Sequence, residues 1–163
     1  MKLYRIKKSK IDNKGRGLYA TKYIRSGTKI INYKGKIITN KQLDRSDKYD
    51  NGKPIYLFTL NKRYTLDGDF SWNIAGLVNH SCNPNSEYDS KGFKVWITAI
   101  KDIKQGEEIT CDYGFSFDKD YKQFPCNCNS INCCGYIVQE VSRWRINKKF
   151  AMSNKNKLIK NSK

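Results

Sequence analysis

The stretch VNHSCNPN, residues 78–85, contains the only histidine of the chain, His80, and its first cysteine, Cys82. Asparagines at positions 79, 83 and 85 surround this pair. Asparagine favours turns because its short side chain bonds to nearby backbone groups. A chain with a single imidazole therefore places it two residues from a thiol, in a tight loop. This pattern indicates a functional segment.

The cysteines of the chain are concentrated near its C-terminal end. Of six cysteines, four lie within residues 126–134. In a reducing compartment, such close spacing favours a metal site over disulfides, although buried free thiols or disulfides are the alternatives. The pattern Cys-x-Cys-x4-Cys supplies three thiolates from Cys126, Cys128 and Cys133, whereas a structural zinc ion takes four ligands. We expect the fourth thiolate to come from Cys82.

The two other cysteines, Cys111 and Cys134, are not expected to bind the metal. Adjacent cysteines have difficulty in directing both side chains at one ion, so Cys134 is expected to be a spare thiol beside Cys133, and Cys111 another. A nucleophilic pair of Cys82 with His80 is a weaker interpretation, because a cysteine nucleophile also needs a third group to orient its base. Cys82 is better explained as a metal ligand.

The chain is strongly basic. Its formal net charge is +17, and its 32 Lys and Arg residues comprise 25 Lys and 7 Arg. Such a surface attracts nucleic acid or partners bound to it, although a coding bias toward Lys and Asn would produce the same composition. Residues 141–163 carry eight Lys or Arg residues and no acidic residue. We expect a partly helical, solvated tail with non-specific electrostatic attraction to nucleic acid.

Targeting signals are not visible in the sequence. The first ten residues, MKLYRIKKSK, have no apolar signal-peptide core, and no apolar run approaches the length of a membrane span. We therefore expect an intracellular protein with no membrane partner. It would be nuclear or chromatin-associated in a eukaryote, and cytoplasmic or an exported effector in a bacterium.

The apolar patterning predicts a β-rich fold with little helix. Short strands separated by frequent turns are expected in 3–11, 28–39, 54–68, 92–103 and 104–117, with a turn at Lys34–Gly35. Residues 13–20 are expected to form a turn followed by a short apolar piece. Residues 41–50 and 70–81 are the candidates for short helical turns, and Asn51–Gly52 for a loop. The length of 163 residues fits one domain with a modest addition.

Five segments in order resemble one known family, the SET-domain protein lysine methyltransferases with a post-SET zinc loop. They are NKGRGLYA at 13–20, YLFTLNKRYTLDG at 56–68, VNHSCNPN at 78–85, GEEITCDYGF at 106–115 and FPCNCNSINC at 124–133. The resemblance covers roughly residues 3–137. It implies a mainly β fold, the β-clip SET fold, with several small sheets and a C-terminal pseudoknot of segments 78–85 and 110–113, plus a small zinc-bound loop. It further implies a SET domain at 1–118, a post-SET loop at 119–138 and a basic tail at 139–163.

The resemblance also implies roles for individual residues. S-adenosyl-L-methionine would be the methyl donor, Tyr113 the catalytic tyrosine, and Tyr56 a wall of the narrow channel for the substrate lysine. Structural Zn2+ would be bound by Cys82, Cys126, Cys128 and Cys133. The methyl donor would be bound by Lys14, Gly15, Arg16, Gly17, Asn79, His80, Tyr113 and Phe124.

One position departs from the family pattern. Two residues before the catalytic tyrosine, the family usually has Phe or Tyr, and this chain has Cys111. Because cysteine is small and has no hydroxyl to hold a water in place of a methyl, we expect di- or trimethylated products.

The expected substrate is a lysine ε-amine on a histone or on another chromatin- or ribosome-associated protein. The competing hypothesis is a catalytically inactive, zinc-containing module that binds nucleic acid or nucleosomes.

Overall fold

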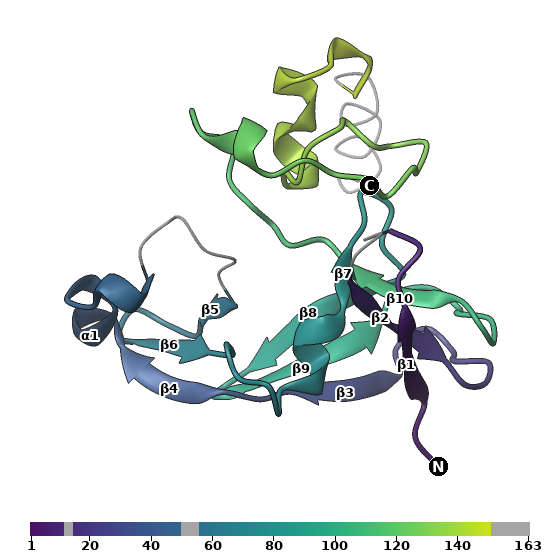
Figure 1. Cartoon of the computed structure of the whole chain (residues 1–163), viewed down its shortest axis with the longest axis horizontal. Coiled ribbons are helices and arrows are strands. Elements are labelled where there is room, and N and C mark those ends of the chain that lie inside the picture. The colour runs from purple at the N-terminus through teal and green to yellow at the C-terminus, as the bar shows by residue number, and fades with distance from the viewer. Residues whose placement is uncertain (12–14, 50–55, 151–163) are drawn as a thin grey trace, which may run out of the picture.

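Small β-sheets form most of the molecule (Figure 1). The computed structural model describes residues 1–11, 15–49 and 56–150. Within these residues three sheets are present, as the β-rich prediction requires. The first has the order β1-β2-β10-β7, with bounds Tyr4–Lys8, Arg16–Ala20, Glu108–Cys111 and Asn79–His80. The second is β3-β9-β8, with bounds Lys29–Tyr33, Lys94–Ala99 and Ser86–Lys91. The third is β4-β6-β5, with bounds Lys36–Thr39, Tyr64–Asp67 and Leu57–Thr59.

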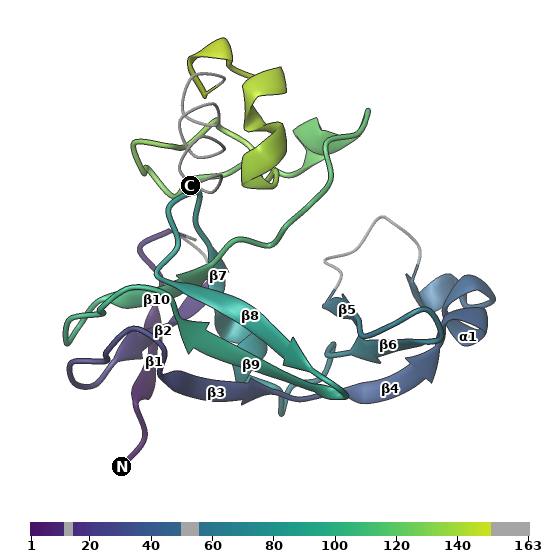
Figure 2. The same ribbon diagram turned by 180° about the vertical axis from the view of Figure 1, so that it is seen from behind.

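Helical structure is short wherever the structure describes the chain. The single α-helix, α1 at Asn40–Asp44 among the described residues, is one turn long and begins at a capping box. The 3₁₀ helices are η1 to η5, with bounds Asp47–Tyr49, Ile74–Leu77, Tyr121–Gln123, Glu140–Arg145 and Lys148–Phe150. Figures 1 and 2 show the segment after β10, with η3 and η4, on one side of the sheets, above β7 and β10. No described helix combines the length and the apolar character needed to cross a membrane.

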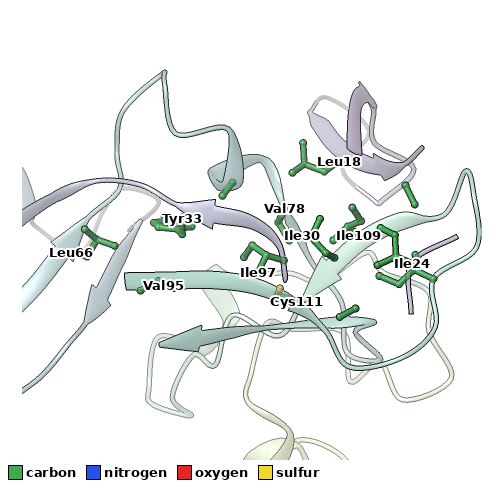
Figure 3. Close-up of a cluster of buried hydrophobic side chains, with 14 residues drawn as sticks. Leu18, Ile24, Ile30, Tyr33, Leu66, Val78, Val95, Ile97, Ile109 and Cys111 are labelled. Atoms are coloured by element: carbon green, nitrogen blue, oxygen red, sulfur yellow. The ribbon is translucent and has the colours of Figure 1, made fainter. Parts of the chain in front are cut away.

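The hydrophobic core lies where the first and second sheets meet. Alternation along β9 turns Val95, Ile97 and Ala99 inward, and all three are almost fully buried. Leu18 of β2 and Ile109 of β10 are fully buried in the same cluster, which Figure 3 shows. Burial of these side chains fixes the register of β10, and therefore the position of the residues that follow it.

Most of the predicted elements are present. Strands occur in every segment where they were expected, and η2 with β7 accounts for the predicted helical turn at 70–81. One predicted turn differs from the structure, and one predicted loop is not tested. Lys34–Gly35 does not join a hairpin, because β3 and β4 belong to different sheets. The predicted loop at Asn51–Gly52 lies outside the described residues.

Strand β8 was not predicted, and a turn explains why it forms. Its sequence, SEYDSK, lacks the apolar alternation of a strand. It pairs with β9 along its whole length, from Ser86 opposite Ala99 to Lys91 opposite Lys94. The two-residue connection begins with Gly92 at φ 62°, a conformation that tight hairpins need and that glycine adopts without strain. The pairing partner and the turn therefore decide this strand.

The predicted boundaries at residues 118 and 138 stay a prediction. Beyond the second boundary, η4 is not a solvated tail throughout, because the Arg143 side chain within it is only 3% exposed. Residues 151–163 of the predicted tail lie outside the described residues.

The link between β3 and β4 generates a prediction about stability. A Cβ on Gly35 would lie 2.1 Å from the Asp67 carbonyl oxygen, which is backbone and cannot move aside cheaply. Overpacking of this kind costs about 1–3 kcal/mol, so Gly35→Ala should lower the urea midpoint of unfolding by a corresponding amount. Gly76→Ala is the control, because the nearest atom would lie at 3.4 Å. Equal midpoints for the two variants would contradict this prediction.

Candidate active site and metal centre

Strands β7 and β10 bring two distant segments side by side. They pair in parallel, with Thr110 opposite Asn79 and Cys111 opposite His80. The Tyr113 backbone N–H donates to His80 Nδ1 at 3.2 Å, and the Tyr113 hydroxyl donates to the Val78 carbonyl oxygen at 3.0 Å. Segment 78–85 therefore bonds to both the backbone and the hydroxyl of Tyr113. The predicted pseudoknot requires such contact between segments 78–85 and 110–113.

The imidazole of His80 is committed to protein partners. It is buried, and burial lowers its pKa to about 4, with the positive charge of Arg143 acting in the same direction. The ring is therefore neutral at pH 7. Since Nδ1 accepts from Tyr113, the proton belongs on Nε2, which faces Cys82 Sγ at 3.5 Å. A bound molecule would have to be contacted by other atoms of His80.

Asn79 belongs to a polar network centred on Glu108. The Glu108 Oε1 atom accepts from Asn79 Nδ2 and from Ser9 Oγ, both at 2.7 Å. Its Oε2 atom accepts from the Tyr19 hydroxyl at 2.7 Å and from the Lys10 N–H at 3.1 Å. Burial and this contact raise the pKa of Tyr19 to about 12. One carboxylate thus ties β2, β7 and the segment directly after β1 to the start of β10.

Gly17 leaves room for that carboxylate. A Cβ at this position would lie 2.3 Å from Glu108 Oε1 and 3.0 Å from Asn79 Nδ2. Asn79 Nδ2 also donates to the Arg16 carbonyl oxygen at 3.1 Å, and the Gly15 carbonyl oxygen accepts from the backbone of Ser9. The structure therefore brings 15–17 and Asn79 together. Lys14, the remaining residue predicted in this group, lies outside the described residues.

Aromatic rings connect Tyr113 with the cysteine-rich loop. The Tyr113 and Phe115 ring centroids are 5.8 Å apart, and those of Phe115 and Phe124 are 5.1 Å apart in an edge-on arrangement. Tyr113 also packs on His80, with a centroid distance of 5.3 Å. Phe124 therefore packs against Phe115, which in turn packs against Tyr113.

A second aromatic group comprises Tyr33, Phe58 and Tyr88, and it is linked to Tyr56 through Tyr33. Tyr56 is 37% exposed, and its ring would lie 3.6 Å from a Cβ on Gly76. Its carbonyl oxygen accepts from the Tyr33 hydroxyl at 3.3 Å. Tyr88 packs against Phe58 with a centroid distance of 4.5 Å.

The Tyr88 hydroxyl interacts electrostatically with predicted site residues. Burial raises its pKa well above the ordinary value, and Cys111, Tyr113, Tyr33 and Tyr56 add to the shift. Tyr88 is therefore within electrostatic reach of both predicted tyrosines, Tyr56 and Tyr113.

Cys111 faces the protein interior. Its side chain is fully buried, its Sγ lies 3.2 Å from Ser86 Oγ, and burial raises its pKa to about 12. The thiol is therefore neutral at pH 7, as expected of a packing group and not of a nucleophile.

The four cysteines predicted to bind metal meet at one point. The Sγ atoms of this thiol cluster all lie within 4.8 Å of one another, and the cluster comprises Cys82, Cys126, Cys128 and Cys133. Tetrahedral zinc with Zn–S distances of about 2.3 Å requires sulfurs about 3.8 Å apart. The Cys82 and Cys126 sulfurs are 3.8 Å apart, so the donor set fits zinc in number, type and spacing.

Hydrogen bonds within the thiol cluster favour thiolates. The Cys82 N–H donates to Cys128 Sγ at 3.3 Å, and the Gly135 N–H donates to Cys133 Sγ at 3.4 Å. Burial acts against ionisation of Cys128, but hydrogen bonds from Ser130 and Cys82 outweigh it and lower its pKa to about 6. By contrast, the Cys126 contact and burial raise the pKa of Cys82. Four thiolates this close repel one another, which a divalent cation would compensate.

Known proteins resemble the chain across this whole region. The model of the SET domain family matches residues 15–114. The chain belongs to the SET-domain family. That match contains β2, segment 78–85 and Tyr113, whereas Cys126, Cys128 and Cys133 lie beyond it.

Individual relatives are much longer proteins. The chain is 37% identical over 129 residues to "Histone-lysine N-methyltransferase trithorax" of Drosophila virilis, covering 76% of this chain and 3% of that protein. It is 36% identical over 125 residues to "Histone-lysine N-methyltransferase 2D" of Homo sapiens, covering 73% and 2%. It is 35% identical over 142 residues to "Putative histone-lysine N-methyltransferase 1" of Plasmodium falciparum, covering 83% and 2%.

The structure contains functional candidates, inside and beyond the SET domain, that the sequence reasoning missed. Glu108 belongs to the GEEITCDYGF segment, but no role was predicted for it. Its carboxylate accepts a hydrogen bond from Asn79 and thereby orients that side chain. Tyr88 lies in a strand that was not predicted. Asp112 and Arg143 form a salt bridge of 2.6 Å, and nothing in a lysine-rich C-terminal segment distinguishes this one arginine. The thiol cluster, by contrast, is as predicted and fits a post-SET zinc site.

The thiol cluster generates a prediction about metal content. We expect one zinc ion per chain by elemental analysis, and loss of most of that zinc in Cys128→Ser. Cys134→Ser is the matched control, because its Sγ lies outside the cluster and contacts the Tyr136 carbonyl oxygen at 3.3 Å. Structural zinc contributes directly to folding, so a chelator should also lower the melting temperature of the wild type. Equal zinc content in the two serine variants would contradict the assignment.

Proposed function

We propose that the chain is a protein-lysine methyltransferase that transfers a methyl group from S-adenosyl-L-methionine to a lysine ε-amine of a histone. The observation that carries this proposal is the crossing of segments 78–85 and 110–113, in which the backbone and hydroxyl of Tyr113 bond to His80 and Val78. Membership of the SET-domain family and the names of the relatives support the same reaction. The chain spans only 2–3% of the length of the relatives reported above, so their whole activities do not transfer to it.

The substrate amine must lose its proton before it can attack. A free lysine has a pKa of about 10.4, so very little of it is nucleophilic at pH 7. Removal of water from the ammonium group disfavours its charged form and lowers its pKa. In the proposed reaction the aromatic side chains of Tyr56 and Tyr113 take this role, by enclosing the lysine and excluding water.

Among the described residues, the two acid–base groups beside Tyr113, His80 and Asp112, are both engaged by other partners. His80 has one ring nitrogen bonded to the Tyr113 N–H and the other directed at Cys82. The Asp112 carboxylate is bonded to Arg143 and to the Gly114 N–H. Deprotonation by desolvation and by a neighbouring positive charge requires neither group, which fits this arrangement.

The chain's own groups would orient the transfer. When bound, S-adenosyl-L-methionine supplies an electrophilic methyl group on a positively charged sulfur. The residues proposed to bind it are Gly15, Arg16, Gly17, Asn79, His80, Tyr113 and Phe124, together with Lys14, which lies outside the described residues. The Tyr113 hydroxyl and the Val78 carbonyl oxygen are 3.0 Å apart, so together they present an ordered polar edge toward the reacting atoms.

The substrate proposal follows from charge as well as from relatives. A net charge of +17 attracts complexes that contain nucleic acid, and histones are packaged with DNA. Non-specific contact of the 139–163 segment with nucleic acid would increase the local concentration of such a substrate. This proposal implies an intracellular, chromatin-associated location.

Tyr113 provides the direct test of catalysis. Incubation with methyl-labelled S-adenosyl-L-methionine and purified histones should transfer label, and Tyr113→Phe should lower kcat by roughly 10²- to 10³-fold, as loss of a positioned hydroxyl does. Tyr23→Phe is the control, because Tyr23 bonds to Asp102 at an exposed position away from Tyr113.

Cofactor binding separates the proposed enzyme from the competing module. Calorimetry should detect binding of S-adenosyl-L-methionine to the zinc-loaded chain. A chain that ignores this compound, transfers no label and still binds DNA would contradict the proposal and favour an inactive nucleic-acid or nucleosome module.

Cys111 generates a prediction about the product. We propose that the chain adds more than one methyl group, because the buried thiol of Cys111 offers no hydroxyl to hold a water in the place of a methyl. Mass spectrometry of methylated histone should show di- or trimethyl-lysine, and Cys111→Tyr should shift the product to monomethyl-lysine.

Tyr88 supplies the control for this product assay. Its hydroxyl lies within electrostatic reach of Cys111 and Tyr113. Only monomethyl-lysine from the wild type, with further methylation by Tyr88→Phe, would contradict the role of Cys111 and assign the restriction to Tyr88.

A further inference from the structure

Arg143 is a buried cation in a segment whose composition predicts a solvated tail. Its side chain is 3% exposed, and it lies in η4 beyond the residues that match the SET domain. The guanidinium donates from Nε to the Val138 carbonyl oxygen at 2.9 Å, and from Nη1 to the Cys82 carbonyl oxygen at 2.6 Å. It donates from Nη2 to Asp112 Oδ2 at 2.6 Å. All three of its nitrogens therefore have an acceptor.

These acceptors belong to three separate parts of the site. Cys82 is one of the proposed zinc ligands, Asp112 directly precedes Tyr113, and Val138 is a fully buried residue at the end of the cysteine-rich loop. A buried charge is costly unless it is paired and hydrogen-bonded. The guanidinium is therefore stable only when these three segments are in place, and its rigid fork fixes their relative positions.

Asp112 transmits this constraint to the neighbouring tyrosine. Its Oδ2 atom is bonded to Arg143, and its Oδ1 atom accepts from the Gly114 N–H at 2.9 Å. The carboxylate thus spans the backbone on both sides of Tyr113. The intervening Tyr113 N–H is bonded to His80. Displacement of Asp112 would therefore move the backbone that carries the Tyr113 ring.

We infer that Arg143 is a positioning residue, which couples the 139–150 segment to Tyr113 through Asp112 and to the thiol cluster through Cys82. This inference rests on the proposed function, because it assigns Arg143 a role in that reaction. The 139–150 segment is then part of the catalytic unit and not an independent arm. Arg143 itself does not contact the reacting atoms; it acts through Asp112 and Tyr113.

Arg145 provides a matched control within the same helix. It is exposed, and its guanidinium lies over the rings of Phe117 and Trp144 at 5.5 and 5.4 Å from their centroids. Arg145→Gln removes the same charge as Arg143→Gln, two residues away, without touching Asp112 or Cys82.

Steady-state kinetics on the full zinc-loaded chain test the positioning role. A small misplacement of a reacting group can cost about 100-fold in rate, so we expect Arg143→Gln to lower kcat by roughly 10- to 100-fold with little change in KM for histone. Arg143→Lys should fall between Arg143→Gln and the wild type, because one ammonium cannot replace the fork toward three acceptors. Arg145→Gln should match the wild type. If activity in Arg143→Gln falls only in proportion to its zinc-loaded fraction, the role is merely structural and the inference is wrong.

Hydrogen exchange tests the same coupling without any assay of activity. Peptides covering residues 110–116 should exchange faster in Arg143→Gln than in the wild type or in Arg145→Gln, because the Tyr113 and Gly114 amides lose their fixed acceptors. Asp112→Asn should produce the same change, and the double variant should change little further. Should Arg143→Gln fail to fold, Arg143→Lys and Asp112→Asn support the same comparison.

The two tests separate failure of this inference from failure of the proposed function. A wild-type chain that methylates nothing would refute the proposed function, and the exchange measurement would still decide the coupling. Unchanged exchange in residues 110–116 of the folded Arg143 and Asp112 variants would overturn the inference even in an active enzyme.

Discussion

The parallel pairing of β7 with β10 is the interaction on which the rest of this structure depends. Asn79 and His80 lie about thirty residues from Thr110 and Cys111 in sequence, yet two residue pairs bring the segments into register. That register directs Asn79 toward Glu108 at the start of β10, and His80 toward Tyr113 just after its end. A shift of one residue would reverse the side chains on a strand and would separate both pairs. The buried side chains of Ile109 and Cys111 hold β10 against such a shift.

The carboxylates of Glu108 and Asp112, at the two ends of β10, connect different parts of the fold. Glu108 accepts hydrogen bonds from β2, β7 and the segment directly after β1, and thereby orders the residues proposed to bind the methyl donor. Asp112 accepts from Arg143, and thereby joins the C-terminal segment to the backbone that carries Tyr113. Each acidic side chain lies within a strongly basic protein, and each is consumed by specific short contacts. Both carboxylates have structural partners, which agrees with the proposed reaction, in which desolvation and orientation replace a general base.

The sequence was sufficient where the chemistry is local or the motif is long. The four thiols were predicted from spacing and ligand number, and the structure brings them together. The short strands were predicted from β-branched and aromatic residues, because such residues fit a half-buried sheet. What was missed depends on tertiary contact. Strand β8 is polar and forms because β9 pairs with it. Arg143 lies in a basic segment whose composition predicts a solvated arm, and only the folded structure places three acceptors around its guanidinium. No local pattern encodes either outcome.

The imidazole of His80 links the proposed zinc site to the backbone of Tyr113. Its Nδ1 atom accepts from Tyr113, which requires the proton on Nε2, and that proton is directed at Cys82 Sγ. A charged sulfur is a stronger acceptor than a neutral thiol. Ionisation of Cys82 as a zinc ligand would therefore hold the ring more firmly, and a firmly held ring keeps Nδ1 in place for the Tyr113 backbone. The single histidine of the chain thus connects the thiol cluster with Tyr113. Its pKa is lowered because this position is buried.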